Sequence, residues 1–315
     1  MIRVGMIGAG NFATVHLRAL AQEPDVEIVG HVSASGQRAQ ANARAFGGSA
    51  FAGVEAFVDE AHPDAAWICT PPGAHGPIED VLIRRKIPFF VEKPLAADLK
   101  AAEEIARALD ASRIIAAVGY HWRAMDTIPG VRKALASSRV LMVSGAWLDA
   151  PPPSDWWYRA ATGGGQMLEQ ATHLIDLARL LVGEAEVAAS AAIGRAPGGP
   201  PDTDVPAAST ALLRFEDGAP GVFSATCALA VRAAVYLQIA CEGLFITIAR
   251  NEAAYEDASG RRSVPVGNDP YVAEDRAFLA ALDRNDPSLL FSPYADALRT
   301  HRLCWKITSV AQGRR

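Results

Sequence analysis

Short apolar runs alternate with amphipathic stretches along the first 120 residues of the chain. This alternation predicts parallel strands joined by helical, right-handed crossovers. Prolines fall at or between the ends of these segments, which supports the boundaries. The predicted strands are residues 2–7, 26–32, 65–70, 87–91 and 114–119, and the predicted helices include 11–22, 37–46, 74–85 and 98–110.

The pattern changes after residue 121, where strand-like stretches follow one another through tight turns. Such a succession is typical of an antiparallel sheet. The predicted strands are 139–148, 185–195, 207–216, 219–229, 233–241 and 244–249, and the predicted helices are 127–136, one long helix at 166–182, 270–283 and 294–311. The expected fold is α/β. A doubly wound Rossmann domain at 1–120 precedes an α+β domain at 121–315 with a large, mostly antiparallel sheet, and the C-terminal helix is expected to pack back on the first domain.

The composition narrows the class of protein. A chain of 315 residues, half of them apolar, can bury two cores, and its net charge of −5 includes no basic stripe for nucleic acid. The four cysteines have neither a disulfide framework nor metal-ligand spacing, and no apolar run is long enough for a membrane span. We therefore expect a cytoplasmic protein without a metal, a nucleic-acid partner or a membrane partner.

A glycine turn opens the chain. Gly8, Gly10 and Ala13 fit the pattern G-x-G-x-x-A between the first strand and the first helix. In this pattern the first glycine permits a tight turn, the second lets the backbone approach a pyrophosphate, and the small third residue packs helix against strand. The sequence predicts a dinucleotide site here, which includes Asn11 and Phe12 in the first turn of the helix.

The segment after the second strand bears on the choice of nucleotide. An acidic residue there would bind the adenosine ribose and repel a 2′-phosphate. The chain instead has Ser33, Ser35 and Arg38, two hydroxyl groups and a cation that suit a phosphate. NADP(H) is therefore favoured, with NAD(H) as the alternative; an arginine on a surface helix is also common without any ligand.

The predicted helix 166–182 carries three polar side chains that are spaced at helical intervals. Glu169 and His173 are four residues apart and His173 and Asp176 three apart, so all three share one helical face. Alone, this spacing also describes an amphipathic helix with its polar side in water. Three glycines at 163–165 directly before the helix favour a site, because they let backbone approach a bulky, flat group such as nicotinamide.

These features in this order, together with Glu92-Lys93-Pro94 at the end of an apolar strand, resemble the Gfo/Idh/MocA family of NAD(P)-dependent oxidoreductases. The resemblance implies that Lys93 holds a substrate hydroxyl, that His173 is the acid/base, and that Asp176 orients substrate or histidine. It implies that Thr70, Pro71, Pro72 and His75 form the segment beside the nicotinamide ribose, with His75 mainly architectural. In the family the Lys-Pro peptide bond is often cis.

The resemblance leaves some roles open. Glu92 either tethers Lys93 beside the cofactor or caps the strand. Glu169 stands where the family pattern has Asp, so its carboxylate reaches one methylene further and its part in substrate binding is a separate question. Tyr120, Arg123, Trp157 and Arg159 are candidates for the substrate site, and packing between the domains is an equally good explanation for them.

The expected function is hydride transfer between a nicotinamide and a secondary alcohol or ketone of a sugar, cyclitol or related small molecule. Two alternatives remain: elimination or cleavage through a transient oxidation, and a non-catalytic nucleotide-binding sensor. An exposed face of the second sheet suggests a homodimer or homotetramer. The sequence does not identify the substrate, the reaction direction or the pathway.

Overall fold

The computed structural model describes residues 1–313, and the chain divides into two compact units. The first comprises residues 1–96, 100–124 and 270–298, and the second comprises 97–99, 125–269 and 299–315. Residues 270–298, which carry helix α10, therefore belong with the N-terminal half of the chain. No helix among the described residues is both long enough and apolar enough to cross a bilayer.

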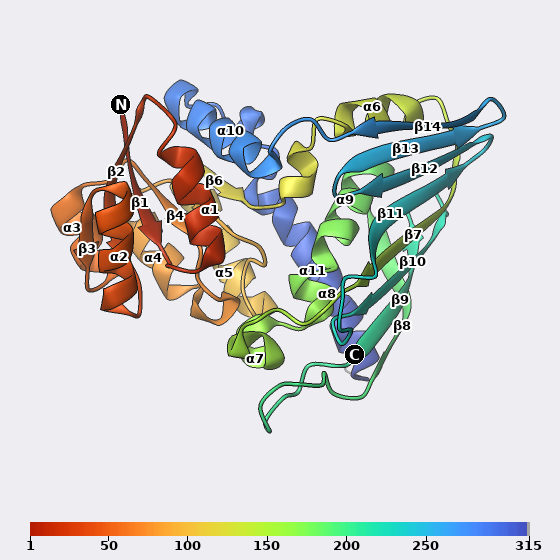
Figure 1. Ribbon diagram of the computed structural model, residues 1–315, viewed down its shortest axis with the longest axis horizontal. Helices are drawn as coiled ribbons and strands as arrows, with labels where there is room; N and C mark the ends of the chain where they lie inside the picture. Colours follow the sequence, from red (N-terminus) through yellow and green to blue (C-terminus); the bar gives the residue numbers. More distant parts are fainter. Residues whose placement is uncertain (314–315) are drawn as a thin grey trace. The chain divides into compact units, whose positions relative to one another are not determined.

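The first unit contains a six-stranded parallel sheet in the order β3-β2-β1-β4-β5-β6 (Figure 1). This order confirms the predicted doubly wound sheet, because the strand order reverses direction at β1. The strands are β1 (Ile2–Ile7), β2 (Val26–Val32), β3 (Ser49–Phe51), β4 (Ala65–Ile68), β5 (Phe89–Val91) and β6 (Ala116–Val118). The helices are α1 (Asn11–Leu20), α2 (Gly36–Phe46), α3 (Val54–Ala61), α4 (Pro77–Arg84), α5 (Leu99–Ser112) and α10 (Pro270–Arg284).

The core of this unit joins segments that are distant in sequence. Phe278 of α10 is fully buried and packs edge-on against Trp67 of β4, with ring centroids 5.1 Å apart. The same cluster contains residues of α1, β1 and β5. Helix α10 is thus part of the hydrophobic core of the six-stranded parallel sheet.

The second unit contains an eight-stranded sheet in the order β14-β13-β12-β11-β7-β10-β9-β8. Every neighbouring pair is antiparallel except β7 and β10, which are parallel, so the predicted mostly antiparallel sheet is confirmed. The strands are β7 (Val140–Leu148), β8 (Ala185–Ile193), β9 (Ala208–Phe215), β10 (Pro220–Thr226), β11 (Ala234–Cys241), β12 (Leu244–Ala249), β13 (Glu252–Asp257) and β14 (Gly260–Pro265). The α-helices are α6 (Ile128–Leu135), α7 (Ala160–Gly163), α8 (Gln166–Glu169) and α9 (Thr172–Val182), together with α11 (Tyr294–Ala311), whose residues 294–298 fall in the first unit.

Helices α8 and α9 lie on one face of this sheet (Figure 1). The prediction of one continuous helix at 166–182 was wrong, because the helix breaks at Gln170 and Ala171. The amide of Ala171 bonds the carbonyl of Gln166, five residues back, instead of following the α-helical ladder. Gln170 is also engaged by the thiol of Cys227, which lies 2.7 Å from its side-chain oxygen. Cys227 directly follows β10, so a residue next to the sheet contacts the helix where the turn is wider.

Candidate active site

The glycine turn between β1 and α1 has the geometry of an open cradle. Gly8 has a φ of +117°, and a side chain there would bring its Cβ within 2.2 Å of the carbonyl oxygen of Cys69. At Gly10 an added Cβ would meet nothing within 4 Å. Gly10 is the N-cap of α1 and makes no side-chain capping bond, so the first amides of the helix, at Asn11 and Phe12, are not capped by a side chain there. These residues fit a dinucleotide pyrophosphate.

The candidate ribose and phosphate residues follow β2. Ser33 is half-buried and its hydroxyl accepts a weak bond from the amide of Ser35 at 3.3 Å. Ser35 is the N-cap of α2, and Arg38 lies exposed in the first turn of that helix. No acidic side chain stands between Ser33 and Arg38.

The segment after β4 is braced by a buried histidine. His75 bonds the carbonyl of Leu95 through Nδ1 at 2.9 Å and that of Thr70 through Nε2 at 3.2 Å, and its Nδ1 lies 3.2 Å from the carboxylate of Glu79. Burial lowers the pKa of His75, but the charge of Glu79 and the hydrogen bonds outweigh it and raise the pKa above 6.5. His75 therefore stabilises the conformation of this loop, which also contains Pro71 and Pro72.

Lys93 is the second residue after β5, at the carboxyl edge of the parallel sheet where ligands of such folds bind. The side chain is half-buried, and the Lys93–Pro94 peptide bond is cis. Glu92 is buried, and its carboxylate bonds His16 at 3.0 Å. The amide of Glu92 continues the sheet ladder by bonding the carbonyl of Ile68. The strand end is thus fixed by both main chain and side chain.

The three polar side chains of 169–176 lie on two helices and are all buried. Glu169, at the end of α8, is 7% exposed, while His173 and Asp176, in α9, are 3% and 1% exposed. The description of this segment as a helix with its polar side in water is therefore wrong. Polar groups are seldom buried without a specific use, so their burial supports a site.

Contacts within the second unit hold two of these groups in place. The indole of Trp147, on β7, stacks on the imidazole of His173 with centroids 5.9 Å apart and planes 21° apart. The hydroxyl of Thr300, on α11, donates to Oδ1 of Asp176 at 2.7 Å and accepts from Arg179 at 2.7 Å. Arg179 is itself held by Glu184. The positions of His173 and Asp176 are therefore set by the sheet on one side and by α11 on another.

The three glycines before α8 serve the local turn. Gly164 and Gly165 have φ values of +77° and +85°, which favour glycine. An added Cβ at Gly163 would lie 3.1 Å from the carbonyl oxygen of Trp157, whereas at Gly165 it would meet nothing within 4 Å. Only Gly165 leaves open space beside the backbone, and its approach to a nicotinamide stays a prediction.

The remaining substrate candidates have partners inside their own units. Arg123 is buried, ion-paired with Asp296 at 2.6 Å, and 5.9 Å from the ring centre of Tyr120, which is 1% exposed. Trp157 is fully buried in a small cluster with Tyr158, and Arg159 is bound through two nitrogens to Asp202. These contacts give each residue a packing or bracing role, and their contact with substrate stays a prediction.

Sequence reasoning missed three side chains that surround the candidates: His16, Trp147 and Thr300. His16 repeats at helical spacing with the buried Ala13, Leu17 and Leu20, a signal that a histidine faces the core. Nothing in the local sequence marks Trp147 or Thr300, because each meets its partner through the tertiary fold.

The first unit brings the glycine turn, the end of β2, the loop after β4 and Lys93 to the same edge of one sheet. The second brings together Glu169, His173 and Asp176 near the break between α8 and α9.

This arrangement agrees with comparisons to known proteins. Residues 2–120 match a family model described as "Oxidoreductase family, NAD-binding Rossmann fold", and residues 134–245 match the "GFO/IDH/MocA C-terminal domain". Together the two matches cover well over half of the chain. The chain belongs to the Gfo/Idh/MocA family. It is thus a member of a family of NAD(P)-binding oxidoreductases.

Two relatives within the Gfo/Idh/MocA family illustrate the similarity. An inositol 2-dehydrogenase of Rhizobium meliloti is 28% identical over 60% of this chain and 58% of its own length. A dTDP-3,4-didehydro-2,6-dideoxy-alpha-D-glucose 3-reductase of Streptomyces violaceoruber is 31% identical over 58% of this chain and 55% of its own length. The alignments with these relatives thus span little more than half of their lengths.

Solved structures confirm the fold over the whole chain. A levoglucosan dehydrogenase in complex with NADH and levoglucosan superposes with a TM-score of 0.89 at 21% identity, covering 99% of this chain and 97% of the other. A 3-ketoreductase from Actinomadura kijaniata in complex with NADP has a TM-score of 0.86 at 22% identity, covering 100% and 98%. At these identities the likeness establishes the fold.

Proposed function

We propose that this protein transfers hydride between NADP(H) and a secondary alcohol or ketone of a sugar, cyclitol or related small molecule. The observation that carries the proposal is the burial of His173 and Asp176 on α9, in a chain whose other unit has an open dinucleotide cradle. A sensor that only binds nucleotide has no need of a buried acid/base pair. Bound nicotinamide would supply the hydride acceptor or donor.

The chain's own residues have distinct roles in this proposal. His173 takes the proton of the substrate hydroxyl in oxidation and returns it in reduction, since histidine titrates near neutral pH. Lys93 places its ammonium at the same oxygen and stabilises the negative charge that develops there. Asp176, fixed by Thr300, orients the substrate or His173.

The substrate class rests on the relatives. Inositol, levoglucosan and dTDP-deoxysugars, named in the relatives, are ring compounds that carry hydroxyl or keto groups. We propose that this chain acts on such a ring, with Glu169, Tyr120, Arg123, Trp157 and Arg159 as the candidate substrate-binding residues. A panel of cyclitols, free and anhydro sugars and nucleotide-activated keto sugars, assayed at 340 nm with both nucleotides, tests the class.

The NADP(H) preference yields a specific prediction at Arg38. Replacing it with alanine removes a charge-assisted bond to the 2′-phosphate, so we expect NADPH to bind about 10- to 100-fold more weakly and NADH to bind as before. Arg44→Ala, an exposed arginine at the far end of the same helix, is the matched control and should change neither affinity. Fluorescence titration of the six tryptophans measures both. Tighter binding of NADH by the unmodified protein would refute the preference.

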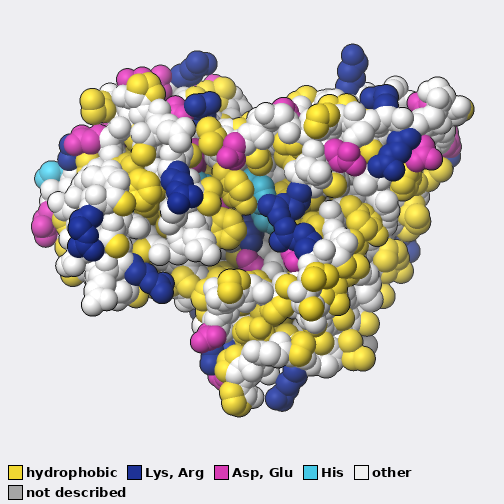
Figure 2. Space-filling model, in the orientation of Figure 1, with side chains coloured by type: hydrophobic (Ala, Val, Ile, Leu, Met, Phe, Trp, Pro, Cys, Tyr) yellow, Lys and Arg dark blue, Asp and Glu magenta, His cyan; other side chains and the backbone are white. Residues whose placement is uncertain are grey.

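One face of the second sheet has the character of a subunit interface. Val222 and Leu212 are cross-strand neighbours, each 42% exposed, and Met142 and Phe245 on the same face are 45% and 36% exposed. We call these four residues the outer face, since α8 and α9 cover the opposite one. Hydrophobic side chains are frequent along the right-hand margin of Figure 2, where this sheet lies. We propose a homodimer or homotetramer through the outer face.

A double substitution tests the interface. Leu212→Glu with Val222→Glu places unpaired charges on the outer face, and we expect the dissociation constant of the oligomer to rise at least about 100-fold, since buried unpaired charge is costly. Light scattering after size exclusion gives the mass of each species. Val231→Glu, exposed in the loop after β10, is the control and should leave the mass unchanged. A monomeric unmodified protein at micromolar concentration would contradict the proposal. Cytoplasmic localisation stays a prediction from the sequence.

A further inference from the structure

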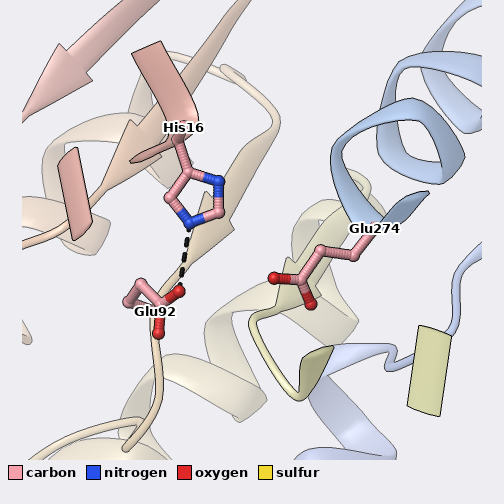
Figure 3. A group of neighbouring side chains, drawn as sticks. All are labelled: His16, Glu92 and Glu274. Carbon is pink, nitrogen blue, oxygen red and sulfur yellow. Dashed lines mark hydrogen bonds and ion pairs between the residues drawn. The ribbon is translucent and has the colours of Figure 1, made fainter. Parts of the chain in front are cut away.

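A buried charged group lies in the first unit, beneath the glycine turn. His16 of α1 is fully buried, and Glu92, which directly follows β5, and Glu274 and Asp275 of α10 converge on it. Figure 3 shows the carboxylates of Glu92 and Glu274 pointing toward the imidazole, with the bond from His16 Nε2 to Glu92 marked. None of these four side chains has a place in the proposed proton or hydride transfer.

Each ring nitrogen of His16 lies within hydrogen-bond distance of a carboxylate. Nδ1 is 2.8 and 2.9 Å from the two oxygens of Asp275, and Nε2 is 3.0 Å from Oε1 of Glu92. A carboxylate in its ionised form only accepts, so in this geometry two ionised partners require both nitrogens to donate, as in an imidazolium. Burial lowers the pKa of His16, but the charge of Asp275 and the bonds to Asp275 and Glu92 outweigh it and raise the pKa well above 6.5.

The group is tightly organised around this cation. The indole of Trp67 donates to Oδ1 of Asp275 at 2.8 Å, which fixes the carboxylate on the far side of the ring. On the near side, a Cβ added to Gly119 would lie 2.9 Å from the carboxylate of Glu92. A larger residue at 119 would therefore have to displace the end of the Glu92 side chain. Its immediate neighbour in the chain is Lys93.

A bound cation is the competing explanation for this group. Ligand atoms of His16, Glu92 and Glu274 all lie within 4.8 Å of one another, which suits a metal ion. However, Nε2 of His16 bonds Glu92 at an ordinary hydrogen-bond distance, and Nδ1 bonds Asp275, so both nitrogens of the ring have a carboxylate partner. The existing hydrogen bonds favour the imidazolium.

We infer that His16 is a positioning residue for Lys93: its cation anchors the carboxylate of Glu92 and thereby the strand end that presents the lysine. This inference rests on the proposed role of Lys93. The buried contact between His16 and Glu92 links α1, which follows the glycine turn, to Lys93 after β5. Displacement of a reacting group by about 1 Å can cost on the order of 100-fold in rate.

The first test measures the protonation state of His16 and the environment of the Lys93 side chain, and it needs no substrate. Nitrogen-15 spectra of the histidines should show His16 doubly protonated at pH 8, and neutral in Asp275→Asn, which keeps the shape of the side chain. Reductive methylation with 13C-formaldehyde labels the five lysines, and the signal of Lys93 is assigned by its loss in Lys93→Arg. It should move in His16→Gln. A neutral His16, or an unmoved Lys93 signal, overturns the inference.

The second test is a double-mutant cycle on kcat with the panel alcohol that reacts fastest. His16→Gln and Glu92→Gln should each lower kcat about 10- to 100-fold with nucleotide affinity within about 3-fold, and the double variant should be no worse than either. Additive losses, or a loss of nucleotide affinity equal to the loss of kcat, would show a structural role only. Stoichiometric metal removed by EDTA with loss of thermal stability would also overturn the imidazolium.

His31→Gln is the matched control, because His31 is another fully buried histidine of the same unit and bonds the main-chain carbonyl of Gly47. This variant should have a lower thermal stability, while the Lys93 signal and kcat should stay as in the unmodified protein. The two spectroscopic readouts remain interpretable even when no alcohol of the panel reacts. A failure of the proposed function is thereby distinguished from a failure of this inference.

Discussion

Replacing His173 with alanine is expected to lower kcat by about 10²- to 10⁴-fold, the usual contribution of a positioned acid/base. Nucleotide affinity should stay within about 2-fold, because the glycine turn, Ser33 and Arg38 all belong to the other unit. Stopped-flow or steady-state formation of NADPH gives kcat, and tryptophan fluorescence gives the affinity.

The cavity left by alanine beside Trp147 needs a control of its own. His173→Gln retains most of the volume but cannot act as the base, so it should be as inactive as the alanine variant while melting closer to the unmodified protein. His62→Ala, an exposed histidine after α3, should keep full activity. Full turnover in either His173 variant would remove His173 from the mechanism.

Replacing Lys93 with methionine should lower kcat by about 10²- to 10³-fold, the effect of removing one group that stabilises a developing oxyanion. Methionine fills a similar volume, so the half-buried position stays packed while the charge and the donors are lost. The measurement is kcat and KM with the same panel alcohol. We expect kcat to fall more than KM rises, because the charge on the oxygen develops only in the transition state.

Lys100→Met is the matched control for this second variant. Lys100 lies seven residues further along, on α5, and its side chain is 84% exposed and near Glu104. It should leave both kinetic constants unchanged. An unchanged kcat in Lys93→Met would show that Lys93 does not stabilise the substrate oxygen. It would also remove the basis for the role of His16.

The fold could be predicted largely from local patterns, and the elements that were missed explain the limits. Each long apolar run became a strand, because burial on one or both faces of a sheet leaves a direct trace in the sequence. Strands β13 and β14 were not predicted, and the six residues of β14 are all exposed and carry no apolar alternation. It is a strand because it pairs with β13. Strand β3, with only three residues, is equally hard to recognise.

The candidate site was predictable where residues and their roles follow one another in sequence. The glycine turn, Lys93 after its strand, and the spacing of His173 and Asp176 are of this kind. The break between α8 and α9 was not, because it involves Cys227, 57 residues away from its partner. The group around His16 joins residues 76 and 259 positions apart, and only the fold brings them together.

Deuterium labelling shows whether this chain transfers hydride from a ring alcohol to a nicotinamide nucleotide. The purified protein is incubated with NADP⁺ or NAD⁺ and a panel of alcohols deuterated at carbon, myo-inositol and levoglucosan among them, and the nucleotide is analysed by mass spectrometry. We expect one deuterium to pass from an alcohol to the reduced nucleotide, and none to pass in His173→Ala. A protein that binds neither nucleotide and transfers no label from any alcohol would contradict it.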